Sequence, residues 1–441
     1  MAATPNAKNQ LIVFGRYPTV GRVKTRLIPA LGPAGAAALQ KRFTEQTLVE
    51  TRRSAARTGA RVIFCHDGGT RQQIDRWLNL DGGSARPQAT GDLGRRMFVA
   101  ISEAFRCGAK RVVLMGTDIP GLCADILNQA LARLERHDLV LGPSTDGGYW
   151  LIGMSRPENL FDGIAWSLPT VLEKTVALAK QKAMRVSLLA PLNDVDTPED
   201  LARWPGSGQW AAPYVSIVIP TLNEAPQIGD TIAATVAADA EIIVSDGGSS
   251  DRTLALAREF GVRVVTGGKG RAGQQNRGAA VARGRVLLFL HADTRLPRGY
   301  VNHVFETLMD RRTVLGAFRF ATDARTSAMD WIAFWTNLRA GRLGLPYGDQ
   351  ALFMRRRDFD HAGGFPDVPI AEDLYLVRRL ARRGRIALAP AAAVTSARRW
   401  QRLGIMRTTL INTMIAAGCL AGVDPHRLAP LYRPKRKTTN R

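Results

Sequence analysis

A chain of 441 residues is too long for one hydrophobic core and predicts two domains of about 200 residues each. Its composition, 45% hydrophobic and 22% charged, is ordinary for folded protein, and its formal net charge of +23 predicts an anionic partner such as nucleic acid, anionic lipid or a phosphorylated molecule. The four scattered cysteines, Cys65, Cys107, Cys123 and Cys419, argue against a zinc knuckle or a disulfide framework.

The first ten residues lack the apolar core of a secretory signal, so we expect a cytoplasmic protein. The first predicted strand, Leu11 to Phe14, leads into a loop with a glycine and several basic side chains, and a helix is predicted over residues 34–58. The loop lacks the spacing of a P-loop, yet its cations would neutralise phosphoryl oxygens. Its predicted nucleotide-binding residues are Arg16, Gly21, Lys24 and Arg26.

Two later strands of this half end in carboxylates. Asp118 follows the strand that starts at Arg111, and Asp146 follows the strand that starts at Asp138. Two carboxylates on neighbouring strand ends suit Mg²⁺ held together with a nucleotide, so both are predicted metal ligands. The alternative is structural, since the residues after Asp146 make a good turn.

Proline and glycine interrupt the pattern near residues 203–214, which predicts a linker. We therefore expect a first domain over residues 1–204, a linker over 205–214, and a second domain over 215–441 with a basic C-terminal tail. Each domain begins with an apolar strand followed by helices, which indicates βαβ units and an α/β fold.

Three apolar strands of the second half end in polar residues, at Glu224, Asp246 and Asp293. The carboxyl ends of parallel strands share one edge of a sheet, where ligands bind. Asp246 and Gly247 suit contact with a base or ribose, although an Asx turn with a helix cap would use the same residues.

A glycine-rich and basic segment over residues 267–278 is predicted to be a loop that leads into a helix starting at Ala279. Glycine, arginine and a helix start together favour phosphate binding, and a solvated flexible loop is the alternative. The predicted nucleotide-binding residues of this half are Pro220, Asn223, Glu224, Asp246, Gly247, Arg271, Asn276 and Arg277.

Asp293 is the predicted metal ligand, because one carboxylate and the oxygens of a substrate diphosphate can hold Mg²⁺ or Mn²⁺. His291 is either a further ligand or an orienting residue. Glu372 and Asp373 open an amphipathic helix, where they either cap it or supply a general base.

The C-terminal region is rich in arginine and lysine, and its apolar segment from Thr408 to Val423 is shorter than the roughly 20 residues that cross a bilayer. It is either an interfacial anchor or a helix packed on the domain. Aromatic side chains do not interleave with the basic ones, so no nucleic-acid partner is expected.

In these motifs, residues 214–430 resemble an inverting family 2 glycosyltransferase with a GT-A fold, of the type associated with selenodomain and arsenosugar proteins. The resemblance implies a nucleotide-sugar donor, a hydroxyl acceptor, Asp373 as the catalytic base, and His291-Ala-Asp293 as a variant of the Asp-x-Asp metal motif. Residues 396–400 match only part of the processive-synthase motif, which implies single transfers of a hexosyl type. The residues expected to face the acceptor or the diphosphate are Gly348, Asp349, Gln350, Glu372, Arg399 and Trp400.

Residues 10–204 resemble the DUF2064 transferases, which are related to deazaflavin-cofactor guanylyltransferases and molybdenum-cofactor nucleotidyltransferases. The resemblance rests on Gly21 to Leu27, Gly116 to Pro120 and Asp146 to Tyr149. It implies a nucleoside triphosphate substrate and a nucleotidyl transfer that would make the donor for the second half.

We therefore expect two Rossmann-like, nucleotide-diphospho-sugar transferase domains of GT-A type in tandem, in a bifunctional cytoplasmic enzyme; peripheral contact of its basic C-terminus with the inner face of the membrane is left open. The alternatives are a first half that binds nucleotide without catalysis, or a membrane-surface scaffold.

Overall fold

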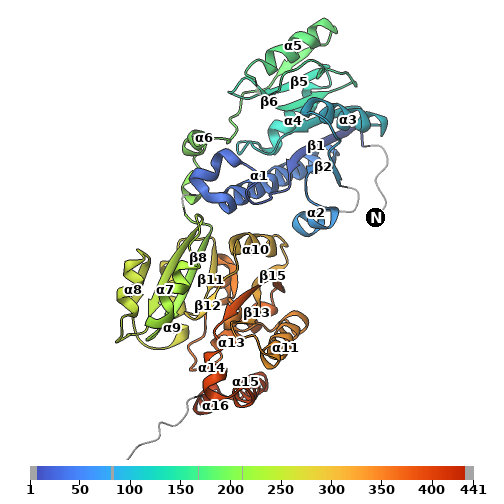
Figure 1. The fold of residues 1–441 in the computed structure, drawn as a ribbon. Coiled ribbons are helices and arrows are strands. Elements are labelled where there is room, and N and C mark those ends of the chain that lie inside the picture. Colours follow the sequence, from blue (N-terminus) through green and yellow to red (C-terminus); the bar gives the residue numbers. More distant parts are fainter. Residues whose placement is uncertain (1–6, 81–83, 167, 211, 433–441) are drawn as a thin grey trace, which may run out of the picture. The chain divides into compact units, whose positions relative to one another are not determined.

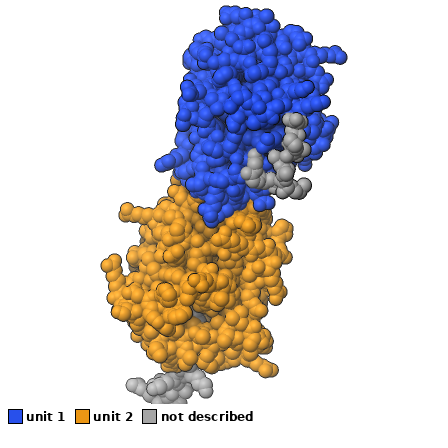
Figure 2. Space-filling model, turned by 90° about the vertical axis from the view of Figure 1, so that its right-hand side faces the viewer, with its two compact units in different colours: residues 1–211 blue, residues 212–441 orange. Residues whose placement is uncertain are grey.

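The computed structural model describes residues 7–80, 84–166, 168–210 and 212–432. The chain divides into two compact units, unit 1 (Met1–Ala211) and unit 2 (Ala212–Arg441) (Figure 2). The division falls inside the segment predicted as a linker. Part of that segment is nevertheless packed, because the 3-10 turn η2 (Ser207–Trp210) buries Trp210 in a hydrophobic cluster of unit 1.

Unit 1 is a sheet with helices packed around it (Figure 1). The seven strands are β1 (Asn9–Arg16), β2 (Arg61–Asp67), β3 (Ala85–Pro87), β4 (Arg111–Met115), β5 (Leu139–Pro143), β6 (Tyr149–Met154) and β7 (Val186–Leu188). The helices are η1 (Thr25–Leu27), α1 (Ile28–Thr58), α2 (Arg71–Leu78), α3 (Leu93–Arg106), α4 (Ala124–Arg133), α5 (Val171–Gln181) and α6 (Pro198–Arg203).

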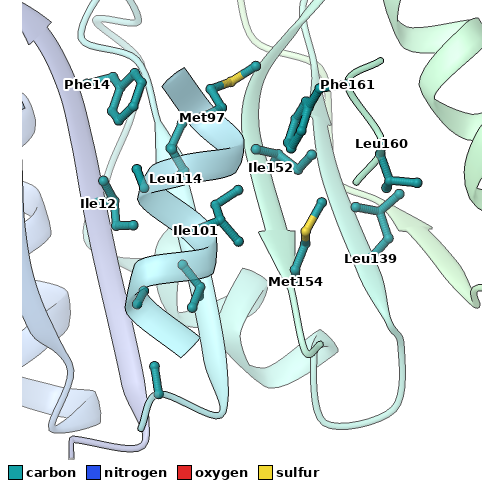
Figure 3. Packing of buried hydrophobic residues seen from close by; sticks show 14 of the residues in the cluster. Ile12, Phe14, Met97, Ile101, Leu114, Leu139, Ile152, Met154, Leu160 and Phe161 are labelled. Atoms are coloured by element: carbon teal, nitrogen blue, oxygen red, sulfur yellow. The ribbon is translucent and has the colours of Figure 1, made fainter. Parts of the chain in front are cut away.

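The central strand β1 forms because its apolar residues are covered on both faces of the sheet. Leu11, Ile12 and Val13 are all fully buried, as expected for a strand inside a parallel sheet with helices on both sides. One face packs on α3 in a cluster that includes Ile12, Met97 and Leu114 (Figure 3). The helix predicted over residues 34–58 begins earlier, at Ile28, and is interrupted at Gly32, whose positive φ of 69° breaks the helical pattern.

Unit 2 repeats this plan with an added short strand. Its eight strands are β8 (Val215–Thr221), β9 (Ala240–Asp246), β10 (Arg263–Thr266), β11 (Val286–Phe289), β12 (Thr294–Arg295), β13 (Thr313–Thr322), β14 (Phe353–Arg355) and β15 (Arg385–Thr395). Its helices are α7 (Ala225–Ala233), α8 (Thr253–Glu259), α9 (Arg271–Val281), α10 (Tyr300–Thr307), α11 (Ser327–Leu343), η3 (Gly348–Gln350), α12 (Arg356–Ala362), α13 (Glu372–Ala381), α14 (Arg398–Leu403), α15 (Ile405–Leu420) and α16 (Pro425–Tyr432).

The two sheets share one strand order. Unit 1 runs β3-β2-β1-β4-β6-β5-β7, and unit 2 runs β10-β9-β8-β11-β14-β13-β15 followed by β12. Neither sheet is wholly parallel, since β6 pairs antiparallel with β4 and β5, and β14 pairs antiparallel with β11 and β13. Both units therefore have the mixed α/β sheet of the GT-A-like transferase fold.

One prediction for unit 2 was wrong. The segment predicted as a glycine-rich loop over residues 267–278 is helical from Arg271, because α9 begins eight residues before Ala279. Gly278, which was predicted to belong to this loop, lies in α9 and packs against β8. A Cβ at Gly278 would lie 2.3 Å from Cγ1 of Val218 in β8. Close contact between helix and strand, rather than flexibility, explains this glycine.

Candidate functional site

Side chains from separate elements of unit 2 meet around Gly348 in η3. A Cβ at Gly348 would lie 2.8 Å from Nε2 of His291 and 3.2 Å from Oδ2 of Asp373. The Gly348 N–H also donates a hydrogen bond of 2.6 Å to that Asp373 oxygen. The end of β11 and the start of α13 therefore contribute to one neighbourhood, in which three predicted site residues lie together.

The two carboxylates that open α13 have different surroundings. Glu372 is buried, and its Oε1 lies 3.5 Å from Nη1 of Arg271 in α9. Burial raises the pKa of Glu372, Arg271 opposes that rise and Asp373 adds to it. Asp373 accepts a second hydrogen bond, of 2.8 Å, from the N–H of Leu374. Glu372 is thus committed to an internal ion pair, while Asp373 is held by backbone donors.

Asp349 adds a third acidic group to this neighbourhood. Burial raises its pKa to about 6, with Arg339 lowering it and the charges of Asp373 and Asp293 raising it. Arg339, in α11, lies 3.5 Å from the centre of the Tyr347 ring and donates to a backbone carbonyl. The mutual effect of these carboxylates indicates that Asp293, Asp349 and Asp373 belong to one electrostatic cluster.

Asp293 lies near Glu224 and Arg398. Burial raises the pKa of Asp293, while Arg398 and Arg271 lower it. Burial and the Asp293 charge raise the pKa of Glu224, and the guanidinium of Arg398 lies 3.9 Å from Glu224. The sequence analysis named Arg399 as a site residue and not its neighbour Arg398. Only the structure shows that Arg398 lies near Glu224. The side chain of Arg399 lies outside the described residues.

The carboxylate of Asp246 is hydrogen-bonded within its own loop and to the neighbouring strand. It is fully buried and accepts hydrogen bonds from the N–H groups of Gly248 and Ser249, the Ser249 hydroxyl and the Thr221 hydroxyl, at 2.5 to 3.3 Å. These are the contacts of the Asx-turn alternative. Its role in binding nucleotide stays a prediction.

The other predicted nucleotide residues also form internal bonds. Asn223 accepts a bond from the N–H of Ser250, Asn276 exchanges two bonds with the backbone of Phe365, and Arg277 donates to Gly268. A buried glutamine that the sequence did not single out, Gln274, joins the ends of β8 and β9 through the carbonyls of Thr221 and Ser245, at 2.6 and 3.1 Å. Gly247 gives it room, since a Cβ there would lie 2.8 Å from Gln274 Nε2. Pro220 precedes Thr221, the last residue of β8.

Two residues expected at the acceptor or diphosphate have core contacts. Gln350 is fully buried and donates to the carbonyl of Phe318 at 3.1 Å. Trp400 is buried in a cluster with Phe320 and Ile332. Both side chains therefore pack inside the protein, and their contacts with a ligand stay predictions.

Among the described residues, no three acidic, histidine or cysteine side chains converge as a metal site. Asp293 is the side chain of the predicted metal motif that we expect to bind an ion, and the hydroxyl of Thr294 lies 3.5 Å from its Oδ1. A hard divalent ion bound by one carboxylate takes its other ligands from substrate oxygens and water.

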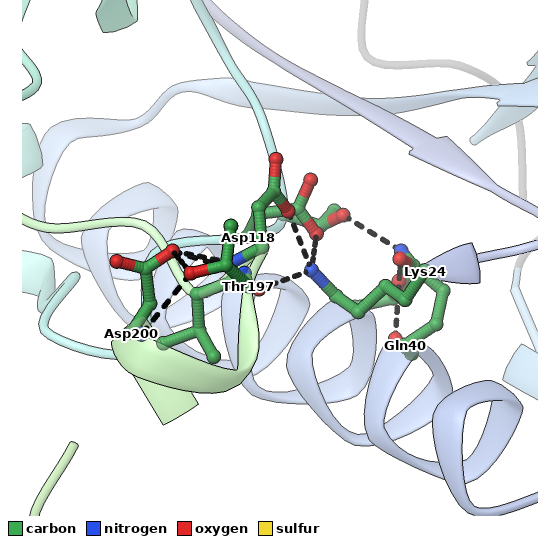
Figure 4. A network of polar contacts seen from close by, with 9 residues as sticks. Lys24, Gln40, Asp118, Thr197 and Asp200 are labelled. Carbon is green, nitrogen blue, oxygen red and sulfur yellow. Dashed lines mark hydrogen bonds and ion pairs between the residues drawn. The ribbon is translucent and has the colours of Figure 1, made fainter. Parts of the chain in front are cut away.

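In unit 1, the corresponding loops bring Lys24 to two carboxylates (Figure 4). Its ammonium lies 2.9 Å from Asp118 and 3.1 Å from Asp196, and donates to the carbonyl of Val195 at 2.8 Å. Burial alone would lower the pKa of Lys24, but the two carboxylates outweigh it and raise the pKa. Lys24 has a left-handed φ of 44°, which turns its side chain inward from the loop. A phosphate contact by this ammonium stays a prediction.

The remaining predicted residues of unit 1 lie nearer the surface. Arg16 is exposed, 3.6 Å from Asp67, and Gly21 and Arg26 are exposed as well. Asp146 is exposed and accepts bonds from the Ser144 hydroxyl and the Gly148 N–H, so it makes the predicted turn.

Asp194, which was not among the predicted site residues, lies near Asp146 and Asp196. Burial raises the pKa of Asp194 to about 6, and the charges of Asp196 and Asp146 add to the rise. The signal for it was present in the sequence, because the Asp194-Val-Asp196 segment ends the domain.

None of the described helices has the length and hydropathy needed to span a bilayer. All four cysteines are free thiols.

Two family models match parts of the chain. Residues 216–362 match glycosyl transferase family 2, and residues 50–168 match DUF2064, which is described as an uncharacterized protein family conserved in bacteria. A PGL/p-HBAD biosynthesis glycosyltransferase of Mycobacterium bovis (strain BCG / Pasteur 1173P2) is 43% identical over 96 residues, 20% of this chain and 38% of that protein. The chain thus spans well under half of the curated relatives it matches.

Solved structures give similar partial matches. A candidate nucleotide-diphospho-sugar transferase from Desulfovibrio desulfuricans G20 is 35% identical, covers 44% of this chain and 85% of that chain, and has a TM-score of 0.41. The mannosyltransferase PcManGT from Pyrobaculum calidifontis, solved with GDP-Man and Mn²⁺, is 23% identical, covers 50% of this chain and 68% of that chain, and has a TM-score of 0.38. By the family matches and the shared strand order, the chain joins a DUF2064 region in unit 1 to a glycosyl transferase family 2 region in unit 2.

Proposed function

We propose that unit 2 transfers a hexosyl group from a nucleotide-sugar to an acceptor hydroxyl with inversion at the anomeric carbon. The observation that carries the proposal is the meeting of His291, Gly348 and Asp373. The first two lie within residues 216–362, which match glycosyl transferase family 2, and Asp373 follows that match in the chain. Asp293, Glu224 and Arg398 form the neighbouring polar cluster.

In the proposed reaction Asp373 accepts the proton of the acceptor hydroxyl. The acceptor oxygen then forms a bond to the anomeric carbon, while the bond from that carbon to the phosphate oxygen breaks and the nucleoside diphosphate leaves with the electron pair. The two backbone N–H groups on Asp373 orient its carboxylate for this step. Arg271 and Arg398 would pair with the departing diphosphate, whose stabilisation is the larger contribution.

The residues present fit a divalent ion held by Asp293, with His291 as a second ligand or an orienting group. When bound, Mg²⁺ or Mn²⁺ would neutralise the charge that develops on the diphosphate. Glu224, close to Asp293, adds negative charge that favours a cation at this place.

The test is a donor panel on the full chain. UDP- and GDP-linked hexoses are incubated with the protein and Mn²⁺, and release of the nucleoside diphosphate is measured with water or added alcohols as acceptor. We expect release from one class of donor, loss of release with EDTA, and an inverted anomeric configuration in the product by NMR. Retention of configuration, or release that EDTA leaves unchanged, would contradict the mechanism.

For unit 1 we propose nucleotidyl transfer from a nucleoside triphosphate, with Arg16, Lys24 and Arg26 near phosphate and Asp118 and Asp146 near a metal ion. The DUF2064 match and the pairing of the Lys24 loop with Asp118 support it. Its product would be the activated donor of unit 2, a link that rests on the fusion of the two units. Pyrophosphate release from a nucleoside triphosphate tests it; binding without release would favour the non-catalytic alternative.

A second proposal, peripheral contact with the inner face of the membrane, has support from two helices of unit 2. One face of α15 is packed through Ile415 and Cys419, while Met406, Leu410 and Met414, about one turn apart, are exposed by 84%, 62% and 49%. Exposed apolar stripes of this kind occur on helices that lie in a lipid interface. In α11, Trp331, Phe334 and Trp335 are also exposed. The basic residues 433–441 lie outside the described residues.

A further inference from the structure

Unit 1 contains a cavity of about 300 Å³ whose lining includes Asp118 and Asp146, the proposed metal ligands of nucleotidyl transfer, together with an apolar part to which that proposal gives no role. One side is apolar, formed by Phe14 of β1, Met97 of α3, Leu114 of β4 and Trp166. The first three are buried members of one hydrophobic cluster (Figure 3), and Trp166 packs against it. The other side carries the carboxylates Asp118, Asp146 and Asp194.

Two glycines leave room for the indole rings that line the cavity. A Cβ at Gly142 would lie 2.5 Å from the indole of Trp150, and a Cβ at Gly94 would lie 2.7 Å from the indole of Trp166. Both indoles therefore lie directly against backbone, and the rings of Tyr149 and Trp166 meet edge to face at 6.4 Å. An aromatic lining packed against backbone in this way is typical of a largely preformed ligand site.

The charge along the lining has one sign. Every Asp, Glu, Lys, Arg or His along the described lining is an aspartate, in a chain whose net charge is +23. The nearby ammonium of Lys24 is already shared between Asp118 and Asp196. A metal-free anion entering this cavity would meet repulsion, and a cation would meet attraction.

We propose that this cavity binds an organic ligand whose ring-like or branched apolar body fills the space between Met97, Leu114 and Trp166 and whose polar end brings positive charge to Asp118, Asp146 and Asp194. Two kinds of ligand supply such a positive charge: a ligand with an amine of its own, and a phosphate ester that carries a divalent ion. The inference rests on the proposed nucleotidyl-transfer site of unit 1 and describes the ligand of that site. It concerns binding alone, so its failure is distinguished from a failure of nucleotidyl transfer, which pyrophosphate release measures.

The experiment uses the full chain and three probes of nearly equal shape, 2-(1-naphthyl)ethylamine, 2-(1-naphthyl)ethanol and 1-naphthylacetate. Binding is measured by titration calorimetry at pH 7.5 and low salt. If the amine supplies the charge, we expect it to bind about tenfold more tightly than the alcohol, and the acetate to bind most weakly, because one favourable charge contact of about 1.4 kcal/mol is a factor of ten. A fourth probe, 1-naphthyl phosphate with and without Mg²⁺, distinguishes the second source, since it would then bind only with the ion.

Two variants locate the binding. D146N, at an exposed position that preserves the fold, should weaken the charged probe several-fold and leave the alcohol unchanged, whereas D162N, an exposed aspartate outside the lining, should change neither. M97W should fill the cavity and abolish binding of all probes, with circular dichroism as the check on folding. The proposal is overturned if no probe saturates the protein, if the alcohol or a metal-free anion binds as tightly as the best cation-bearing probe, or if D146N leaves the charged probe unaffected.

Discussion

Asp373 and Glu372 are adjacent in the chain, yet their surroundings give them different tasks. Glu372 is buried against Arg271, which makes it part of the link between α9 and α13. Asp373 is oriented by two backbone N–H groups and lies next to Gly348 and His291. Glu372 and Asp373 therefore differ in role because they occupy different positions in the first turn of the helix, not because of their residue types.

D373N should lower the turnover number for glycosyl transfer by about 10²- to 10⁴-fold, because an amide cannot take the acceptor proton. The affinity for the nucleotide-sugar should stay within about twofold, since hydrogen bonds from the backbone to the side chain are retained in part. Turnover is measured by diphosphate release and affinity by calorimetry. D360N, at an exposed position in α12, is the matched control. Normal turnover by D373N would remove Asp373 as the base.

D349N should stabilise the protein at neutral and alkaline pH. The pKa of Asp349 is about 6 in the folded chain and about 3.9 when unfolded, so the wild type loses stability as the pH rises through 6. Asparagine does not ionise and avoids this loss. We expect a gain in unfolding free energy of up to about 3 kcal/mol at pH 8 that shrinks as the pH falls to 4. Urea denaturation at several pH values measures it, and a gain independent of pH would refute the assignment.

At the scale of elements, α9 connects the ends of β8 and β9 with the start of α13. Its first residue, Arg271, reaches Glu372, and Gln274 in its first turns ties together the ends of β8 and β9. The helix can approach the sheet closely enough for these contacts because Gly278 faces Val218.

G278A and G273A should therefore have opposite effects on the same helix. Alanine favours a helix over glycine by up to about 1 kcal/mol, which is the whole effect expected at Gly273, where a Cβ would lie 3.4 Å from Nη1 of Arg277, an ordinary van der Waals contact. At Gly278 the clash with Val218 should dominate and lower stability by about 1 to 3 kcal/mol. Denaturant titration of both variants measures the difference; equal stabilities would show that α9 can shift away from the sheet.

The exposed stripe of α15 predicts association with liposomes. Replacing Met406, Leu410 and Met414 together with serine should weaken binding to anionic liposomes by about tenfold or more, because apolar burial in the interface is lost. Co-sedimentation at low and high salt measures the association. Replacing Val236 and Phe260, which are exposed elsewhere in unit 2, with serine is the control. Unchanged association of the triple variant would rule out α15 as the contact.

At the scale of the whole molecule, one topology occurs twice with different chemistry at corresponding positions. After the fourth strand of each sheet comes a carboxylate, Asp118 in unit 1 and Asp293 in unit 2. Asp118 is paired with a buried lysine, whereas Asp293 lies near arginine and glutamate. The shared fold therefore does not imply a shared reaction.

Two separate cores predict two thermal transitions in the full chain. A bound nucleotide-sugar with Mn²⁺, at about 100 times its dissociation constant, should raise the midpoint of one transition by about 5 to 10 °C. G278A should lower the same transition, which assigns it to unit 2. Scanning calorimetry measures both, and a donor that raises only the transition unaffected by G278A would assign donor binding to unit 1.

The sequence by itself determined the strands, their polar ends and the two-part organisation, because apolar runs such as Leu11 to Phe14 and Val215 to Ile219 have few other ways to become buried. It also predicted Asp293 and Asp373 as site residues from local motifs.

Only the tertiary structure decided which partners the predicted site residues have. Asp246 is hydrogen-bonded within its turn, Lys24 pairs with two carboxylates, and Arg398 lies near Glu224, because these contacts join residues far apart in the chain or depend on local backbone geometry. The start of α9 at Arg271 likewise depends on how Gly278 packs against β8, a contact that glycine content alone does not reveal.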